Sequence, residues 1–144
     1  MATIQTIFDE GISALNARDY AKFESLHASN PDILQSDVRQ DIKAHIEGFK
    51  VLTAGFPDGR WTYERPIRDG EQASAETRFE GTQTGTLTLP GMPEILPTGK
   101  KVNLTASVVL NLHDGKVTRV RLYTDRMQLV EQLGIMPAPQ TATV

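Results

Sequence analysis

The spacing of the apolar residues changes at Arg60, and this change limits the possible folds more than any other feature of the sequence. Before Arg60, apolar residues recur every three or four positions, which is the spacing of one face of a helix. After Arg60 they recur at every second position, which is the spacing of a strand with one buried face. Helices followed by strands indicate an α+β fold, in which the helices pack on one face of a mostly antiparallel sheet.

The first 56 residues predict three helices. The apolar stripe of the first helix consists of Ile4, Ile7, Phe8, Ile12 and Leu15. A second, short helix follows Asp19, which can cap it, and has to end before Pro31. The third helix is expected behind Asp37, where Gln40 three residues later resembles a capping box, and closes near Gly55.

The rest of the chain predicts a series of strands, at residues 60–66, 73–80, 86–89, 102–112 and 117–124. Asp69-Gly70 and Asp114-Gly115 are hairpin turn signals. The segment 90–99 holds three prolines and two glycines and is expected to be a loop. The strand at 102–112 has one face that is apolar throughout, so it is expected to line the core.

Length and composition narrow the class of protein. At 144 residues, the chain is expected to form one domain over 1–136, followed by a flexible tail over 137–144. It has no cysteine, and its three histidines lie far apart in the sequence, so neither a thiolate nucleophile nor a metal site is expected. A net charge of −3 without a basic cluster argues against nucleic-acid binding.

The sequence also predicts where the protein resides. The N-terminus lacks the basic and apolar regions of a secretory signal, and no stretch approaches the 18 or so apolar residues of a membrane span. A cytoplasmic protein with no membrane partner is therefore expected.

Asp125 is the candidate catalytic residue, because it directly follows the strand that ends at Thr124. Its orientation depends on the turn at Asp114-Gly115. An even loop places Asp125 on the apolar face of the sheet, where desolvation raises the pKa of a carboxyl group and makes it a usable acid or base. A three-residue loop places it on the other face with Thr105 and Ser107, which gives the tidier binary pattern. Asp125 can also simply cap the helix that follows.

Several short motifs occur along the chain in a fixed order, with Asp125 and Gln132-Leu133-Gly134 as the last of them. Those before it are Phe56-Pro57-Asp58 with Arg60, Gly81-Thr82-Gln83-Thr84-Gly85, Pro97-Thr98-Gly99-Lys100 and Asp114-Gly115-Lys116-Val117. Together they resemble the SnoaL-like polyketide cyclase family, within the nuclear transport factor 2-like superfamily. The resemblance implies a cone-shaped α+β barrel around an apolar pocket, commonly in a homodimer, with an aspartate matching Asp125 that faces the pocket as general acid and base.

Five residues are candidates for substrate binding, one from the resemblance and four from their positions on the strands. The family often has histidine where this chain has Gln83, and glutamine can orient a carbonyl group but cannot transfer a proton near neutral pH. Tyr123 and Arg121 share a face of the last strand and are candidates to bind a substrate oxygen. Trp61 and Tyr63 are candidates for the pocket wall.

Three functions follow from these expectations. The first is a cofactor-free enzyme, in which Asp125 moves a proton beside a carbonyl group in an intramolecular aldol cyclisation or a related isomerisation of a small apolar compound. The second is a small-molecule-binding or dimerisation module without catalysis, which Gln83 favours. The third is an epoxide hydrolase, which requires a second carboxylate near Asp125, and Glu76 and Glu80 are the strand candidates.

Overall fold

The computed structural model of the protein describes residues 4–135. In chain order its elements are α1 (Ile4–Asn16), α2 (Tyr20–Ser25), β1 (His27–Gln35), β2 (Val38–Gln40), α3 (Ile42–Gly55), β3 (Arg60–Asp69), β4 (Gln72–Thr82), β5 (Lys101–His113), β6 (Lys116–Thr124) and α4 (Arg126–Leu133). Within the described range, no helix is long and apolar enough to cross a membrane. The predicted tail, 137–144, lies outside the described residues.

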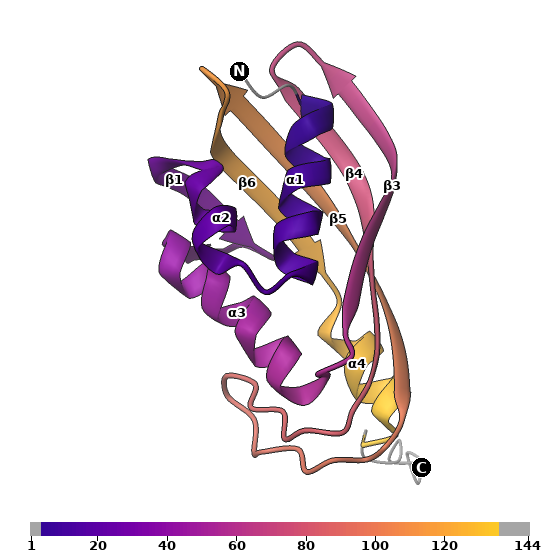
Figure 1. The fold of residues 1–144 in the computed structure, drawn as a ribbon. Helices are drawn as coiled ribbons and strands as arrows, with labels where there is room; N and C mark the ends of the chain where they lie inside the picture. The colour runs from indigo at the N-terminus through magenta and orange to yellow at the C-terminus, as the bar shows by residue number, and fades with distance from the viewer. Residues whose placement is uncertain (1–3, 136–144) are drawn as a thin grey trace, which may run out of the picture.

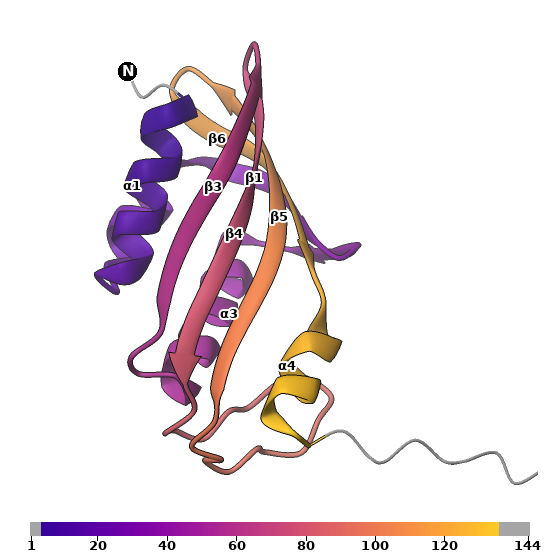
Figure 2. The ribbon, with the colours of Figure 1, turned by 90° about the vertical axis from the view of Figure 1, so that its right-hand side faces the viewer.

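The strands form one six-stranded sheet in the order β2-β1-β6-β5-β4-β3 (Figure 1). Every neighbouring pair is antiparallel except β1 and β6, which are parallel, so the sheet is mixed. The sheet curves, and α1, α2 and α3 lie on one of its faces (Figures 1 and 2). The predicted α+β class is therefore confirmed, but β2 and β3 are the two ends of an open sheet and no barrel closes.

The sequence did not predict β1 and β2, because their segment was expected to be helical. β1 begins at His27, directly after α2, and pairs with β6, which lies about ninety residues further along the chain. Pro31 falls where the register of this pair shifts, a position in which a strand tolerates proline. Long-range pairing of this kind overrides local propensity.

The start of α3 was predicted four residues too early. Asp37 lies in the turn between β1 and β2 with a positive φ of 68°, and the predicted capping box there is wrong. The capping residue is Asp41, whose carboxylate accepts a hydrogen bond of 2.8 Å from the backbone N–H of Ala44. The expected strand at 86–89 is also absent, because only one isolated bridge joins Leu87 to Ile95.

The core consists of two apolar clusters between the helices and the sheet. The first lies towards α3 and α4 and includes Phe56, Trp61, Phe79 and Leu133. The second lies towards α1 and includes Ile7, Phe8, Leu110 and Val120. Ile42, at the start of α3, packs against both clusters, so α3 joins the two halves of the core.

The glycines at the end of β4 allow a close contact with the end of α3. The backbone N–H of Gly85 donates to Gly55 O at 3.1 Å. A Cβ atom added at Gly85 would lie 2.0 Å from Ala54 O, which no packed structure tolerates. The motif that begins at Gly81 therefore has a packing function, since it brings the loop after β4 against the helix.

Helix α4 is attached to the sheet by two glutamine side chains. β6 ends opposite Ala106, so the first residues of β5 have no strand on that side. The amide of Gln132 accepts from Asn103 N at 2.6 Å and donates to Asn103 O at 2.9 Å. The amide of Gln128 bonds the backbone N–H and C=O of Thr105 in the same way, at 3.1 and 3.2 Å. Two side chains four residues apart on one helix thus replace the missing strand.

Candidate functional site

The register between β5 and β6 decides which residues face the helices. Of the loop lengths left open by the sequence, the Asp114-Gly115 turn has an even one, two residues, both with positive φ. A bulge follows, however, because Leu112 pairs with Val117 and Asn111 with Arg119, which leaves Thr118 without a partner in the ladder. The bulge reverses the parity that an even loop would have set.

As a result, the last strand has the second of the two expected orientations, the one that places Asp125 on the same face as Thr105 and Ser107. Val120 pairs with Leu110 and Leu122 with Val108, so these residues lie on the helix-covered face. Arg121 and Tyr123 point to the opposite face of the sheet, which we call the outer face. The orientation of Asp125 towards an enclosed apolar pocket, expected from the resemblance, is wrong.

Asp125 is exposed and caps α4. Its Oδ1 accepts a hydrogen bond of 2.9 Å from the backbone N–H of Met127, in the usual geometry of a helix N-cap. The residue is extended (φ −119°), as a capping residue at the end of a strand should be. The carboxylate therefore has a structural task that does not depend on a ligand.

Gln83 is fully buried and has no free polar group for a ligand. Its amide nitrogen lies 3.1–3.3 Å from three backbone carbonyl oxygens, those of Gly85, Ile95 and Leu96. Its oxygen accepts from the backbone N–H of Thr98 at 3.1 Å and from its hydroxyl at 2.7 Å. The side chain holds the loop between β4 and β5 together, and the predicted contact with a substrate is not available in this arrangement.

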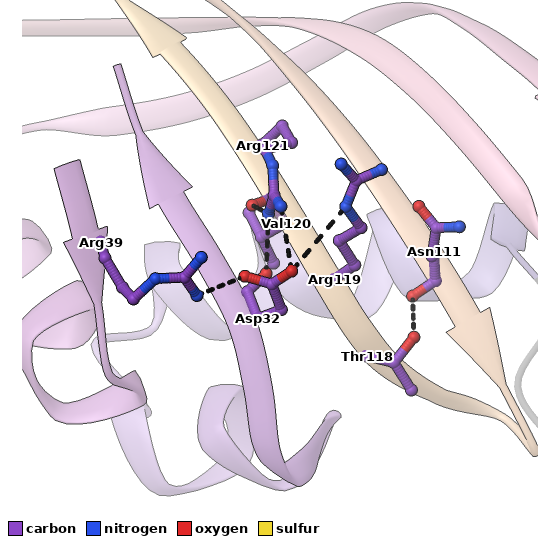
Figure 3. Close-up of polar contacts among 7 residues, drawn as sticks. All are labelled: Asp32, Arg39, Asn111, Thr118, Arg119, Val120 and Arg121. Carbon is purple, nitrogen blue, oxygen red and sulfur yellow. Dashed lines mark hydrogen bonds and ion pairs between the residues drawn. The ribbon is translucent and has the colours of Figure 1, made fainter. Parts of the chain in front are cut away.

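Arg121 bonds a carboxylate on the outer face (Figure 3). Its guanidinium donates to Asp32 Oδ2 at 2.9 Å and to Asp32 O at 3.0 Å, and its side chain is only 13% exposed. Arg39 lies 2.7 Å from Asp32 Oδ1, and Arg119 lies 4.0 Å from Oδ2. The hydrogen bonds from Arg121 and then Arg39 hold the pKa of Asp32 below its usual value. Arg121 thus connects β6 to β1.

The three predicted aromatic residues lie apart. Tyr123 is on the outer face, 52% exposed and opposite Ser107. Trp61 is buried in the first core cluster. Tyr63 donates a hydrogen bond to Asp9 and stacks on Phe8 with ring centres 5.3 Å apart, beside an open groove of about 460 Å³ between α1 and β3. They do not converge on a common point with Asp125.

The arrangement for epoxide hydrolysis is also not formed. Glu76 and Glu80 are exposed on β4, and β5 lies between that strand and β6. Glu76 has an ion pair with Arg65 at 3.7 Å. No second carboxylate therefore comes from β4 to meet Asp125. Within residues 4–135, no group of three or more histidine, aspartate or glutamate side chains has the arrangement of a metal site.

A strip of apolar side chains on the helix-covered face is incompletely covered. This strip, which we call the concave strip, consists of Leu104, Ala106 and Val108 on β5 and Leu122 on β6, all only partly buried. Polar side chains border it, because Gln35 lies opposite Leu122 and Thr124 opposite Ala106. An apolar floor with a polar border suits a small, mostly apolar ligand.

Two histidine rings lie close to each other between α3 and the start of β1. His45 on α3 is 4% exposed, with its ring edge-on to Phe49 at 4.9 Å and 6.3 Å from the ring of His27. Burial, and then repulsion from His27, lower the pKa of His45 to about 4. Burial also lowers the pKa of His27, whose Nδ1 donates to Phe23 O at 2.9 Å. Sequence reasoning treated both as structural or surface residues. The available signal was the helical spacing of Ile42, His45 and Phe49.

The fold and the concave strip define a class of protein: small α+β domains whose curved sheet presents a partly open apolar surface beneath helices. Comparison with family models identifies the family. The model described as SnoaL-like polyketide cyclase matches residues 3–133, so the chain belongs to the SnoaL-like polyketide cyclase family. No curated protein matches the sequence.

Solved structures agree with this family assignment. AclR of Streptomyces galilaeus, provisionally described as a hydroxylase, superposes with a TM-score of 0.80 at 18% identity, over 92% of this chain and 96% of its own. IdmH of Streptomyces antibioticus, provisionally described as a polyketide cyclase, gives 0.77 at 18% identity, over 91% and 98%. A protein of Jannaschia sp. CCS1, provisionally described as a SnoaL-like polyketide cyclase, gives 0.72 at 23% identity, over 93% and 90%. At these identities the likeness extends to the fold alone.

Proposed function

We propose that this protein binds a small apolar molecule on the concave strip and that Asp125 is not its acid or base. One observation carries the proposal: the Asp125 carboxylate caps α4 and is exposed, while apolar side chains of the helix-covered face remain partly uncovered. A general acid or base works best where water is excluded. The exposed carboxylate of Asp125 is in contact with water and is already bonded to the helix.

Binding is tested with 2-methoxynaphthalene, a planar and largely apolar probe, by calorimetric or fluorescence titration of the full chain. Val108 and Val109 provide a matched pair, because they are neighbours on β5 that face opposite sides of the sheet. Val108→Thr should weaken binding about fivefold, since a hydroxyl buried without a partner costs about 1 kcal/mol. Val109→Thr should leave the affinity unchanged. Absence of saturable binding to the unmodified protein would refute the proposal.

The cyclase remains the second candidate, and membership of the family favours it. Asp125→Asn separates the two functions, because asparagine caps a helix about as well as aspartate but cannot transfer a proton. If the variant loses turnover of a polyketide-like carbonyl compound by orders of magnitude and retains affinity, the cyclase is correct. If the unmodified protein binds the compound without converting it, the binding function is correct.

We also propose that a second copy of the chain covers the outer face. None of α1, α2 and α3 lies on this side of the sheet, and Tyr123 is about half exposed there. Ser107 is exposed on β5, near the middle of this face. Light scattering should give twice the mass of the chain, and Ser107→Arg should give the monomer, whereas Thr88→Arg in the loop should not. A monomeric unmodified protein would contradict the proposal.

A further inference from the structure

Three arginines surround a single carboxylate at one corner of the outer face (Figure 3). The carboxylate is that of Asp32 on β1, and its oxygens lie 2.7 Å from Arg39, 4.0 Å from Arg119 and 2.9 Å from Arg121. We call these four residues the arginine cluster. No other carboxylate of residues 4–135 lies within 4 Å of the three guanidinium groups. The cluster therefore has a surplus of two positive charges, in a chain whose net charge is −3.

The paired residues of the neighbouring strands add no negative charge. On β5, Asn111 lies opposite Arg119 and Val109 lies opposite Arg121. On β1, Leu34 lies opposite Arg121. Like charges held this close repel one another. An anion that binds beside the cluster would relieve this repulsion.

Most guanidinium donors of the cluster have no acceptor within the described part of the chain. A guanidinium group has five N–H donors. Arg121 donates three hydrogen bonds, to Asp32 Oδ2, Asp32 O and Val120 O. Arg39 donates one, to Asp32 Oδ1, and Arg119 donates none to residues 4–135. Because the side chains of Arg39 and Arg119 are 70% and 45% exposed, these donors are available to a ligand.

Hydrogen bonds within the protein hold the cluster in place. The side chain of Arg121 is only 13% exposed and donates to the backbone of β1 as well as to the Asp32 carboxylate. The same carboxylate accepts the 2.7 Å bond from Arg39. A guanidinium group that is already oriented loses less conformational entropy when a ligand binds.

The charge of the cluster selects a doubly charged oxyanion. A phosphate group with two negative charges balances the surplus, whereas a carboxylate balances only half of it. The planar fork of a guanidinium group also binds two phosphate oxygens at once. A nucleic acid fits less well, because it requires basic side chains spread along its length and the cluster is a single compact group.

We propose that Arg39, Arg119 and Arg121 bind the phosphate group of a small phosphorylated compound. This site goes beyond the proposed function, because it lies on the opposite face of the sheet from the concave strip. It also lies beside the centre of the proposed contact with a second copy. Tyr123 is four residues from Arg119 along β6, which is about 13 Å, and β1 and β2 are at one end of the sheet.

The experiment titrates the full, ¹⁵N-labelled chain with methyl phosphate at pH 7.5, with the ionic strength held constant by sodium chloride. Backbone amide resonances of β1, β2 and β6 around the cluster should shift and saturate, with a Kd of about 1 mM. Arg39→Gln and Arg119→Gln should each weaken binding about tenfold, which corresponds to about 1.4 kcal/mol, because each removes a charged donor. Arg68→Gln, at an exposed arginine of β3, should leave the Kd unchanged. Acetate, with a single charge, should bind about tenfold more weakly than methyl phosphate.

Four results would overturn the proposal. Shifts that do not saturate, or that are scattered over the surface, would indicate general screening by salt. Binding that persists when Arg39→Gln and Arg119→Gln are combined would place the ligand elsewhere. Binding of inorganic phosphate without binding of methyl phosphate would make the ligand the free ion. If methyl phosphate does not bind and the combined variant is monomeric by light scattering while the unmodified protein is a dimer, the cluster contacts the second copy instead. None of these results bears on the concave strip.

Discussion

Gln83 should be among the residues on which stability depends most, and Gln83→Met tests this. Methionine is close to glutamine in volume but cannot hydrogen-bond, so the variant leaves five polar groups of the loop without their partner. The polar groups near the surface can form hydrogen bonds with water instead. Ile95 O keeps the hydrogen bond of 2.9 Å that it accepts from Leu87 N–H, whereas the partly buried Thr98 N loses its partner, and each lost hydrogen bond or unpaired group costs about 1 kcal/mol or more. We expect a loss of about 3 kcal/mol in the free energy of unfolding.

Urea denaturation followed by the fluorescence of Trp61, the chain's single tryptophan, measures this loss. Thr98→Val removes only the hydroxyl bond to Gln83 and should cost about 1 kcal/mol. Because the two residues share that bond, the double variant should lose less than both single variants combined. Thr84→Val, at an exposed neighbour, should stay within about 0.5 kcal/mol of the unmodified protein. A loss below about 1 kcal/mol for Gln83→Met would refute the loop-organising role and reopen the role in ligand binding.

Three further predictions concern packing, the attachment of α4 and pH. Gly85→Ala should lower the free energy of unfolding by about 3 kcal/mol, as measured by urea denaturation, because its Cβ meets the end of α3. Gly48→Ala, whose Cβ meets nothing within 4 Å, should raise it by about 0.5–1 kcal/mol. Similar effects of the two variants would contradict this account. Gln132→Met should cost about 1–2 kcal/mol and speed hydrogen exchange at Asn103 N, and unchanged exchange would count against the glutamine pairing. Burial lowers the pKa of His45 to about 4, so the unfolded chain binds its proton first as the pH falls below about 6.5, and stability should drop by about 2 kcal/mol between pH 7 and 5. His45→Leu should flatten that slope, and an equally steep slope in the variant would show that other groups cause it.

The sequence predicted the elements whose signals are local. The change of period at Arg60, the turn at Asp114-Gly115 and the helix around Leu129 depend on residues close together in the chain, and the structure contains all of them. The other hairpin turn is also present, but its two residues are Gly70-Glu71, one position later than the predicted Asp69-Gly70. β1 could not be predicted in this way. Its segment is short, holds Pro31, and becomes a strand because β6 provides a parallel partner.

The orientation of the last strand shows a second limit of prediction from the sequence. The Asp114-Gly115 turn was predicted correctly, yet its length alone gives the wrong parity, because the bulge at Thr118 adds one residue to β6. Apolar patterning gave the correct face, since Val120 and Leu122 have to be covered. The resemblance to the family overrode that pattern and led to the wrong orientation of Asp125. A burial pattern over a whole strand is stronger evidence for its orientation than one matched residue at its end.

His45 shows why the candidate site was only partly accessible from sequence. Its spacing from Ile42 and Phe49 indicates the buried face of α3, but the sequence does not reveal that its nitrogen has no partner there. The concave strip could likewise be predicted only in part. Alternation identifies Leu104, Ala106 and Val108 as inward-facing, whereas their incomplete covering depends on the three-dimensional packing of the helices against the sheet.

The C-terminal motif, finally, has a structural explanation that requires no catalysis. Asp125 caps α4, Gln132 bonds the free edge of β5, Leu133 is buried in the core, and Gly134 ends the helix with a φ of 69°. Each residue type suits its position for physical reasons, so any chain that attaches this helix to the free edge of β5 has cause to carry the motif. The motif is therefore evidence for the fold and neutral on the reaction. What the protein does has to be decided at the concave strip, whose incomplete covering the attachment of α4 does not explain.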